Sequence, residues 1–357
     1  MDRKRTALTV AAAGTAAGVA GLVLIASPAG ADETPPVLPP VSAEALVQSV
    51  IQADVPALAG AVELRNDIGL PIPGLPQATG DNVARVYTDG NGRGRISLKQ
   101  GSGERTFVQD GTTTWLWNSA NRSVTKFTGG EDKDGKDTAD KLSDPATAAR
   151  EVVELIKKDS TVAVDGTARV ADRPVYQLVL TPKPTERTLL REVRVSIDSQ
   201  TRVPLRLEVL ANGQSEPALR IGFTEFSTGA QDPALFTFTP PAGVKVTEGA
   251  AKDKGAKADQ ESLFKSANLK IVGEGWDTVA TGQVPAALLS AQIPQSGERA
   301  AADVTSLLKR LGKEVNGPFG TGYVISTKVG TALVTTDGRV AVGAVPQQVL
   351  IDALGQK

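Results

Sequence analysis

Residues 107–127 read FVQDGTTTWLWNSANRSVTKF, a stretch that predicts three strands joined by two turns. The first turn falls at Asp110-Gly111, because glycine tolerates a positive φ and aspartate hydrogen-bonds its own backbone. Between the turns, the run from Thr113 to Asn118 is rich in β-branched and aromatic residues, which favour strands. Trp115 and Trp117 stand two positions apart in this run, so both indoles should lie on one face of the sheet.

The tryptophan pair has two interpretations. Tryptophan is usually well buried wherever it falls, so the pair can be ordinary core. Alternatively, the two indoles form one wall of a cavity large enough for a lipid. The stretch itself leaves both interpretations open.

The composition limits the classes of function. The chain has 357 residues, which favours two domains over one, and 40% of them are hydrophobic. A formal net charge of −1 argues against a nucleic-acid-binding protein, which would carry a basic surface. There is no cysteine and no histidine, which excludes disulfides, thiolate chemistry and lipid attachment through cysteine. The lack of histidine also removes the commonest general base and metal ligand.

Residues 1–31 have the pattern of a secretory signal peptide. Arg3, Lys4 and Arg5 precede an uncharged run, and Ala29-Gly30-Ala31 matches the small-residue cleavage pattern. The run is longer than usual, so an uncleaved membrane anchor is the alternative. Both interpretations predict an extracytoplasmic protein, either secreted or tethered to the outer face of the cytoplasmic membrane. Residues 32–41 form a Pro-rich spacer.

Two helices are predicted in the first part of the chain. One begins after Ser42 as N-cap and ends before Pro56, and the other begins at Asp144-Pro145. Their apolar stripes would form a lid over the strands. The residues of this lid are Leu46, Val47, Val50, Ile51, Val152, Val153 and Ile156.

Between these helices, residues 67–80 form a loop rich in glycine and proline. Its apolar side chains would be unusual on an ordinary surface loop, so we expect them to cover an opening or to contact a partner. These side chains are Ile68, Leu70, Ile72 and Leu75.

A second run of strands, over residues 162–226, alternates apolar and charged residues. This pattern is typical of an antiparallel sheet that is covered on one face only. Only two helices are available to cover it, which favours a strongly curved sheet wrapped around them. Together with Trp115 and Trp117, the expected cavity wall consists of Tyr176, Leu178, Leu180, Val193, Val195, Ile197, Leu205, Leu207 and Val209.

Two acidic segments could suggest a metal or nucleotide site. Asp89-Gly90-Asn91-Gly92 fits a hairpin turn better, because it matches neither the EF-hand loop nor the GxGxxG pattern. Residues 129–141 interleave lysine with the acidic residues and read as a solvated loop. No carboxylate stands on an apolar strand face at a catalytic spacing, so we expect no enzymatic activity, no metal and no cofactor.

Residues 248–262 lack apolar anchors and predict a flexible linker. Residues 263–357 then predict a smaller α+β domain. Its elements would be a strand running into Trp276, a helix over Ala300–Gly312, a three-stranded meander with a turn at Asp337-Gly338, and a closing helix over Pro346–Leu354.

Three motifs, in order, resemble the LolA/LolB/RseB superfamily. The first is VQDG at 108–111 leading to Trp115-Leu116-Trp117 and Asn118. The second is VYQLVLTPK at 175–183, and the third is DPALF at 232–236 followed by TPPAGV at 239–244. The resemblance covers about residues 42–247.

This resemblance implies an α+β fold with a curved, unclosed antiparallel β-barrel lidded by helices. Members of the superfamily carry lipoprotein acyl chains or, in RseB, gate an anti-sigma factor. The chain departs from the simple carriers in its long Pro-rich first loop and in its second domain, a feature that RseB-like proteins have. The resemblance therefore predicts a non-enzymatic binder of lipid or lipoprotein acyl chains. The alternative is a regulator that docks a membrane-anchored anti-sigma factor, with lipid as the signal. The oligomeric state stays open.

Overall fold

The computed structural model describes residues 35–68, 79–101, 103–128, 156–249, 268, 270–283, 292–293, 302–303, 308–310 and 312–355. The predicted signal segment, most of the linker at 248–262, and Leu70, Ile72, Leu75, Val152 and Val153 lie outside these residues. Within the described part of the chain, no helix has both the length and the apolar character needed to span a membrane.

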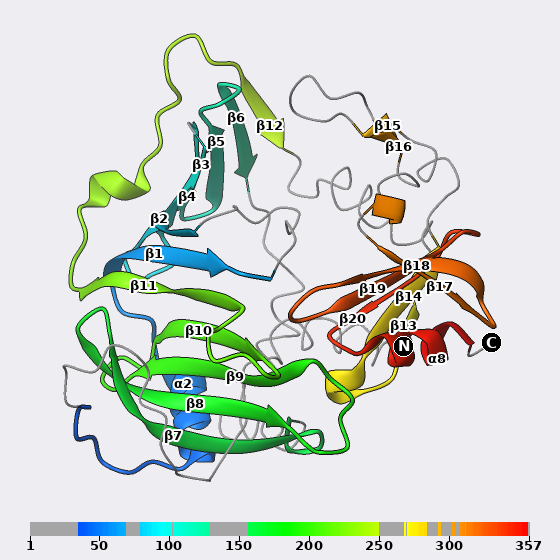
Figure 1. The fold of residues 1–357 in the computed structure, drawn as a ribbon. Coiled ribbons are helices and arrows are strands. Elements are labelled where there is room, and N and C mark those ends of the chain that lie inside the picture. Colours follow the sequence, from blue (N-terminus) through cyan, green and yellow to red (C-terminus); the bar gives the residue numbers. More distant parts are fainter. Residues whose placement is uncertain are drawn as a thin grey trace, which may run out of the picture.

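Twelve strands form one open sheet, whose order is β12-β6-β5-β4-β3-β2-β1-β11-β10-β9-β8-β7. Its pairs are antiparallel except for β12 with β6. Figure 1 shows the sheet bending between β2–β6 and β7–β10, with helix α2 behind β8 and β9. The predicted α+β fold with an unclosed antiparallel sheet is confirmed. The strands are β1 (Leu58–Asn66), β2 (Thr79–Thr88), β3 (Gly94–Gln100), β4 (Gly103–Asp110), β5 (Thr113–Asn118), β6 (Ser123–Thr128), β7 (Ser160–Val170), β8 (Arg173–Pro182), β9 (Leu190–Asp198), β10 (Pro204–Ala211), β11 (Leu219–Thr228) and β12 (Val246–Gly249).

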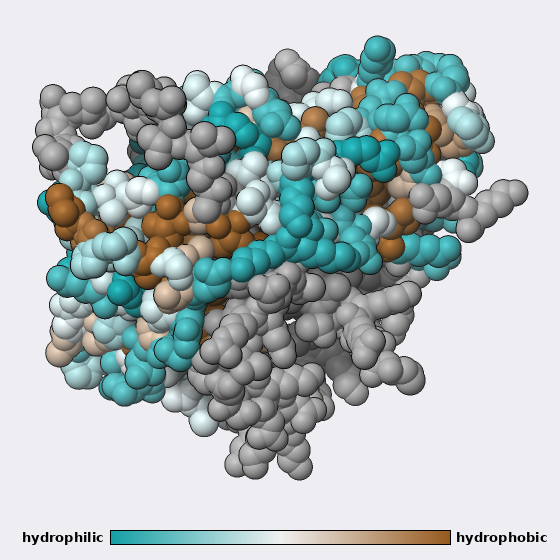
Figure 2. Space-filling view, turned by 90° about the horizontal axis from the view of Figure 1, so that it is seen from below, coloured by the Kyte–Doolittle hydropathy of each residue, from teal (hydrophilic) through white to brown (hydrophobic). Residues whose placement is uncertain are grey.

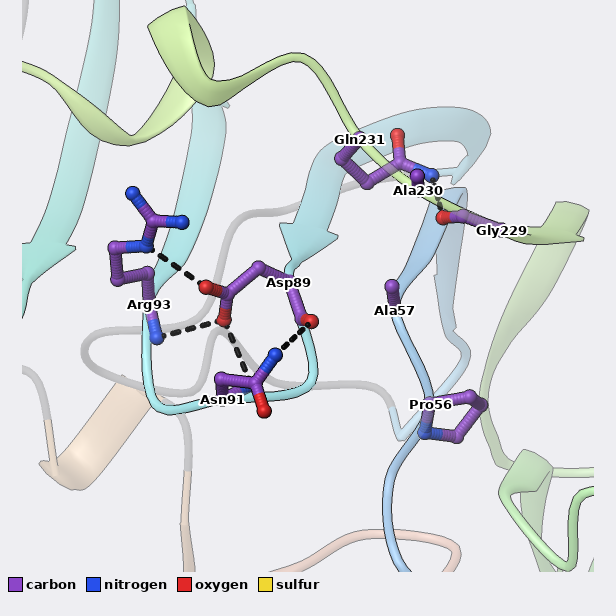
Figure 3. A pocket seen from close by; sticks show the side chains of 8 residues that line it. All are labelled: Pro56, Ala57, Asp89, Asn91, Arg93, Gly229, Ala230 and Gln231. Carbon is purple, nitrogen blue, oxygen red and sulfur yellow. Dashed lines mark hydrogen bonds and ion pairs between the residues drawn. The ribbon is translucent and has the colours of Figure 1, made fainter.

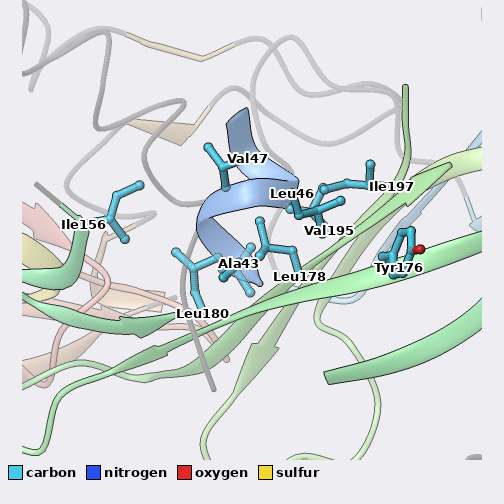
Figure 4. Close-up of a cluster of buried hydrophobic side chains, with 10 residues drawn as sticks. Ala43, Leu46, Val47, Ile156, Tyr176, Leu178, Leu180, Val195 and Ile197 are labelled. Carbon is cyan, nitrogen blue, oxygen red and sulfur yellow. The ribbon is translucent and has the colours of Figure 1, made fainter. Parts of the chain in front are cut away.

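Helix α2 (Ala43–Gln52) begins where the sequence predicts. The Ser42 side chain accepts a hydrogen bond from the amide of Ala45, at 3.1 Å, which satisfies one of the free amides of the first turn. Leu46 and Val47 are buried against strands β8 and β9. The helix therefore positions the largest hydrophobic cluster, which Figure 4 shows from close by.

A buried ion pair fixes the turn between β9 and β10. The guanidinium of Arg173 donates two hydrogen bonds to the carboxylate of Asp198, at 2.9 and 3.0 Å. The same carboxylate accepts hydrogen bonds from the amides of Gln200 and Thr201. Burial alone would raise the pKa of Asp198, but the hydrogen bonds from Arg173 and Thr201 outweigh it and hold this pKa below its ordinary value.

We expect Arg173→Met to lower the free energy of unfolding at neutral pH by about 3–5 kcal/mol, because Asp198 would stay buried without its partner. A lowered pKa stabilises the folded state above the unfolded pKa, near 3.8, and this contribution is lost as the pH falls through the folded value. The difference between wild type and variant should therefore shrink in acid. Urea unfolding between pH 7 and pH 3 measures it. The control Arg105→Met, at an exposed arginine, should stay within about 0.5 kcal/mol of wild type, and a similar loss in both variants would contradict the assignment.

A second sheet has the order β13-β14-β20-β19-β18-β17. Helix α8 (Gln347–Gly355) covers one face, where Val349 and Leu350 pack with Leu333 and Ala341. The predicted meander, its turn with Gly338 at φ +88°, and the closing helix are confirmed. The strands are β13 (Lys270–Val272), β14 (Val279–Gln283), β17 (Lys313–Gly317), β18 (Gly320–Ser326), β19 (Thr331–Thr335) and β20 (Arg339–Gly343).

The prediction of a helix over Ala300–Gly312 is wrong for its first residues. Ala302–Asp303 forms a short strand, β16, which pairs with β15 at Gln292–Ile293. Of the predicted range, residues 308–310 are helical. Backbone pairing with Gln292–Ile293 overrides the helical pattern here, because a hydrogen-bonded partner strand outweighs weak local propensity.

The two sheets contact each other through Trp276, in the short 3-10 turn η3 (Gly275–Asp277). Its indole N–H donates to the buried hydroxyl of Ser160 at 2.7 Å, and its ring packs against the cluster under α2. Its backbone amide donates to the carboxylate of Glu186, at 2.9 Å. Trp276 thus stands in the segment predicted as the second domain, while its side chain packs into the core of the first sheet.

Further contacts surround Trp276. The hydroxyl of Thr188 donates to the carbonyl of Ala344 at 2.6 Å, and the same carbonyl accepts from the amide of Leu189. Ion pairs join Lys158 to Glu274 and Arg187 to Asp352. These contacts join the loop between β8 and β9, and the segment just before β7, to the second sheet and its helix α8.

We expect Trp276→Ala to loosen this contact, because it removes both the buried hydrogen bond and the ring. The amides of Trp276 and Leu189 should exchange with solvent faster, while amides paired between β18 and β19 should not change. Trp276→Phe keeps an aromatic ring and should give an intermediate effect. Hydrogen–deuterium exchange followed by mass spectrometry measures this. Unchanged exchange at Leu189 in the alanine variant would show that Trp276 does not hold the two sheets together.

Candidate functional site

Cross-strand pairing assigns each side chain to a face of the large sheet, because paired residues share a face and successive residues alternate. We call the face covered by α2 the inner face and the opposite one the outer face. On the inner face, Leu178 pairs with Val195, and Val195 pairs with Leu207. Leu207 then pairs with Ile221, and Ile221 with Leu64. The inner face is thus continuous and apolar from β8 to β1.

The same face continues beyond the helix onto β2 and β3. Val62, two residues from Leu64, pairs with Ala84, and Ala84 pairs with Leu98. Leu64 and Ala84 form a small buried cluster, against which Val62 and Leu98 pack. This cluster connects the covered half of the inner face with the half that α2 does not reach.

In that second half, large hydrophobic side chains are exposed to solvent. Ile96 is 40% exposed and Phe107 is 38% exposed, and the two are directly paired. Ile221, on the inner face of β11, is 40% exposed. Phe107 also pairs with the half-buried Leu116 on β5. An apolar sheet face of this kind is typical of a surface that binds an apolar ligand or a partner.

Most of the residues predicted as wall and lid lie together beneath α2. The residues at the centre of this cluster are buried, with Leu180 and Val193 fully inaccessible to solvent. The phenol of Tyr176 donates to the carbonyl of Pro39 at 3.0 Å, so the segment before α2 also lies against this cluster. Figure 2, seen from below, shows hydrophobic residues gathered in a band between hydrophilic ones. The cluster contains Leu46, Val47, Ile156, Tyr176, Leu178, Leu180, Val193, Val195 and Ile197, with Val50, Ile51, Leu207 and Val209 packed at its edge.

Leu205 is an exception among the predicted wall residues. The register between β9 and β10 shifts between Pro204 and Arg206, so Leu205 leaves the alternation that Leu207 and Val209 follow. It packs instead with Val170 and Val175, in a separate buried cluster. Its assignment to the same wall as Leu207 and Val209 is therefore wrong. The one loop residue of the predicted set that the structure describes, Ile68, is buried.

The tryptophan pair lies on the outer face. Both indoles share one face, as predicted, because Trp115 pairs with Val108 and Trp117 with Thr106. The residue between them, Leu116, lies on the inner face, because it pairs with Phe107. The expectation that the pair extends the wall formed by Val193, Val195 and Ile197 is wrong, because the register places the neighbour of each tryptophan, and not the tryptophan itself, on that side.

Ile96 and Phe107 were not among the residues expected in the site. The signal that could have identified them is the alternation in RISLK at 95–99, where Ile96 and Leu98 oppose Arg95, Ser97 and Lys99.

The Asp89 loop is a hairpin turn between β2 and β3, as predicted. The Asp89 carboxylate accepts hydrogen bonds from the amides of Asn91 and Arg93 and from the Arg93 guanidinium, at 2.7–3.0 Å. The hydrogen bond from Arg93 is the main reason that the pKa of Asp89 is lowered. Figure 3 shows these contacts beside a pocket of about 350 Å³ that Pro56, Gly229 and Gln231 also line. The carboxylate serves the turn itself, and nowhere among the described residues do three or more His, Cys, Asp or Glu gather as metal ligands.

Comparisons with known proteins give structural matches only. No family model and no curated protein matches the chain. The complex of MucA and MucB from Pseudomonas aeruginosa matches with 15% identity and a TM-score of 0.39, over 87% of this chain and 94% of the matched one. A LolA superfamily protein from Nitrosomonas europaea matches with 11% identity and a TM-score of 0.22, over 56% and 99%. LprF from Mycobacterium bovis matches with 12% identity and a TM-score of 0.26, over 52% and 96%.

These matches include the LolA superfamily, which the three sequence motifs also resemble. Identities and TM-scores this low carry no argument about ligand or partner.

Proposed function

We propose that this protein is a non-enzymatic binder of an acyl chain, which lies along the inner face of the large sheet. The observation that carries the proposal is the apolar inner face that continues past α2 and exposes Ile96, Phe107 and Ile221. An extended hydrocarbon matches this surface, because the surface is long, apolar and made of side chains from neighbouring strands.

Helix α2 acts as the lid. It covers the half of the inner face that carries Leu178 and Val195, and Leu46 and Val47 are the residues that a longer ligand would displace. Lys157, in the helical turn that ends the second predicted lid, pairs with Glu44 of α2. An exposed ion pair of this kind contributes little, on the order of 1 kcal/mol or less, so it resists displacement only weakly.

The expected affinity suits a carrier. Each buried methylene contributes about 0.8 kcal/mol, so ten give roughly 8 kcal/mol before costs. Association costs of about 4 kcal/mol or more leave binding weak enough for release. We place the protein outside the cytoplasm, because residues 1–31 carry the pattern of a signal peptide or anchor.

Titration with the fluorescent fatty acid 11-(dansylamino)undecanoic acid tests the proposal. We expect saturable binding with a blue shift of the dansyl emission. Phe107→Ser should weaken it by about tenfold, because roughly 1.4 kcal/mol of apolar contact is lost. Val55→Ser, at an exposed valine outside the sheet, is the matched control and should bind like wild type. Equal affinity for the Phe107 and Val55 variants would place the fatty acid elsewhere.

A second candidate function is the docking of a membrane-anchored protein partner on the second sheet. On the face opposite α8, Ile271 pairs with Ala280 and Ala280 with Val342. Ile271 is 49% exposed and Val342 is 50% exposed, so these two side chains offer an apolar surface that is separate from the inner face of the large sheet. This arrangement favours a regulator whose two sheets bind different molecules.

The double variant Ile271→Ser/Val342→Ser in the full chain separates the two functions. If the second sheet docks a partner, the variant should lose co-purification of a membrane protein that wild type retains, while its affinity for the dansyl fatty acid stays unchanged. Retention of the same membrane protein by the double variant would argue against docking at Ile271 and Val342.

A further inference from the structure

The outer face of the large sheet carries a pocket that the proposed lipid site does not use. It has a volume of about 570 Å³ and lies over β3, β4 and β5. Its lining residues are Arg95, Lys99, Gly101, Gly103, Glu104, Thr106, Trp117, Ser119 and Phe238.

One side of this pocket is aromatic. Trp117 lies on β5, and Phe238 follows the 3-10 turn η2 (Pro233–Phe236), which contacts β3 and β4. Phe236 is buried there, and the guanidinium of Arg93 lies 5.4 Å from its ring centre, which anchors the segment. The Phe238 ring also lies 5.5 Å from that of Trp115. Two half-buried rings from different segments therefore offer apolar surface to the same pocket.

The other side of the pocket is basic. Arg95 and Lys99 stand four residues apart on β3, and their alternation places both on the outer face. Within the described part of the protein, neither has a side-chain hydrogen bond or an ion pair, although both lie close enough to the Glu104 carboxylate to help lower its pKa. Most other arginines of the sheet are paired, as Arg85 is with Glu225 and Arg220 is with Glu208. Two cations that share one carboxylate, beside two aromatic rings, give the pocket both positive charge and apolar surface.

One acidic residue, Glu104, completes the lining. Its carboxylate accepts a hydrogen bond from the buried hydroxyl of Thr106 at 2.7 Å. That hydrogen bond is the main reason that the pKa of Glu104 is lowered, so the carboxylate is charged at neutral pH. Together, Arg95, Lys99 and Glu104 give the lining of the pocket a net charge of +1.

We propose that this pocket binds a small organic anion, a phosphate or carboxylate carried on an aromatic ring. Arg95 and Lys99 receive the anionic group, because a guanidinium and an ammonium form charge-assisted hydrogen bonds with such oxygens. Trp117 and Phe238 receive the ring, since offset or edge-to-face contacts between aromatic rings are favourable. The site is independent of the inner face, from which the backbone of the sheet separates it.

Isothermal titration calorimetry of the full chain with phenyl phosphate, inorganic phosphate and benzyl alcohol tests this site. We expect phenyl phosphate to bind at least tenfold more tightly than either of the others, because only it engages both sides of the pocket. Arg95→Gln and Lys99→Gln should each weaken phenyl phosphate by about tenfold. Both residues are at the surface of the sheet, so the fold should survive these substitutions, and circular dichroism checks that it does.

Arg105→Gln is the matched control. Arg105 lies on β4 between Glu104 and Thr106, so it points to the inner face, and the variant should bind phenyl phosphate within twofold of wild type. Phe107→Ser, which weakens the dansyl fatty acid, should also leave phenyl phosphate unaffected. No measurable binding of phenyl phosphate to wild type would overturn the proposal. An equal loss in Arg105→Gln and Arg95→Gln would overturn it too, because binding would then depend on general charge.

Discussion

The packing of one helix against one half of a curved sheet determines what the rest of this molecule can do. Leu46 and Val47 of α2 bury the inner-face side chains of β8 and β9, which makes that half a closed core. The other half of the same face, from β1 to β6, has the same apolar alternation but no helix of the described chain packed on it. Ile96 and Phe107 are exposed because the sheet extends over more strands than α2 covers.

Local patterns predicted the elements well, because turns and alternation are encoded over a few residues. Strand β5 begins and ends at the predicted residues, and Ser42 caps α2 as its side chain suggested. Local patterns predict less well which face of the sheet each side chain occupies. A slip of one residue reverses every side chain of a strand, and bulges at Val62 and at Leu205 alter the parity between neighbouring strands. For this reason the prediction that Trp115 and Trp117 share a face is correct, whereas their assignment to the same wall as Val193, Val195 and Ile197 is wrong.

The contact between the two sheets could not be predicted from local patterns either. Trp276 sits in a three-residue turn, and its partner Ser160 is 116 residues away. No periodicity relates the two residues, and a tryptophan in a short turn is compatible with packing inside either unit. The indole completes the cluster under α2, so the second sheet stabilises the covered half of the inner face. Lys158 and Glu274 join the same region by an ion pair.

An open sheet differs from a closed barrel in that both of its faces can bind ligands, and this chain separates their chemistry by the alternation of its strands. Ile96 and Leu98 bring apolar surface to the inner face of β3, while Arg95 and Lys99 bring charge to its outer face. The backbone between them prevents direct contact, so a ligand on one face has no steric reason to exclude a ligand on the other. Trp276 connects the inner face to the second sheet. A lipid that displaces α2 would disturb that connection, whereas an anion on the outer face would leave it intact.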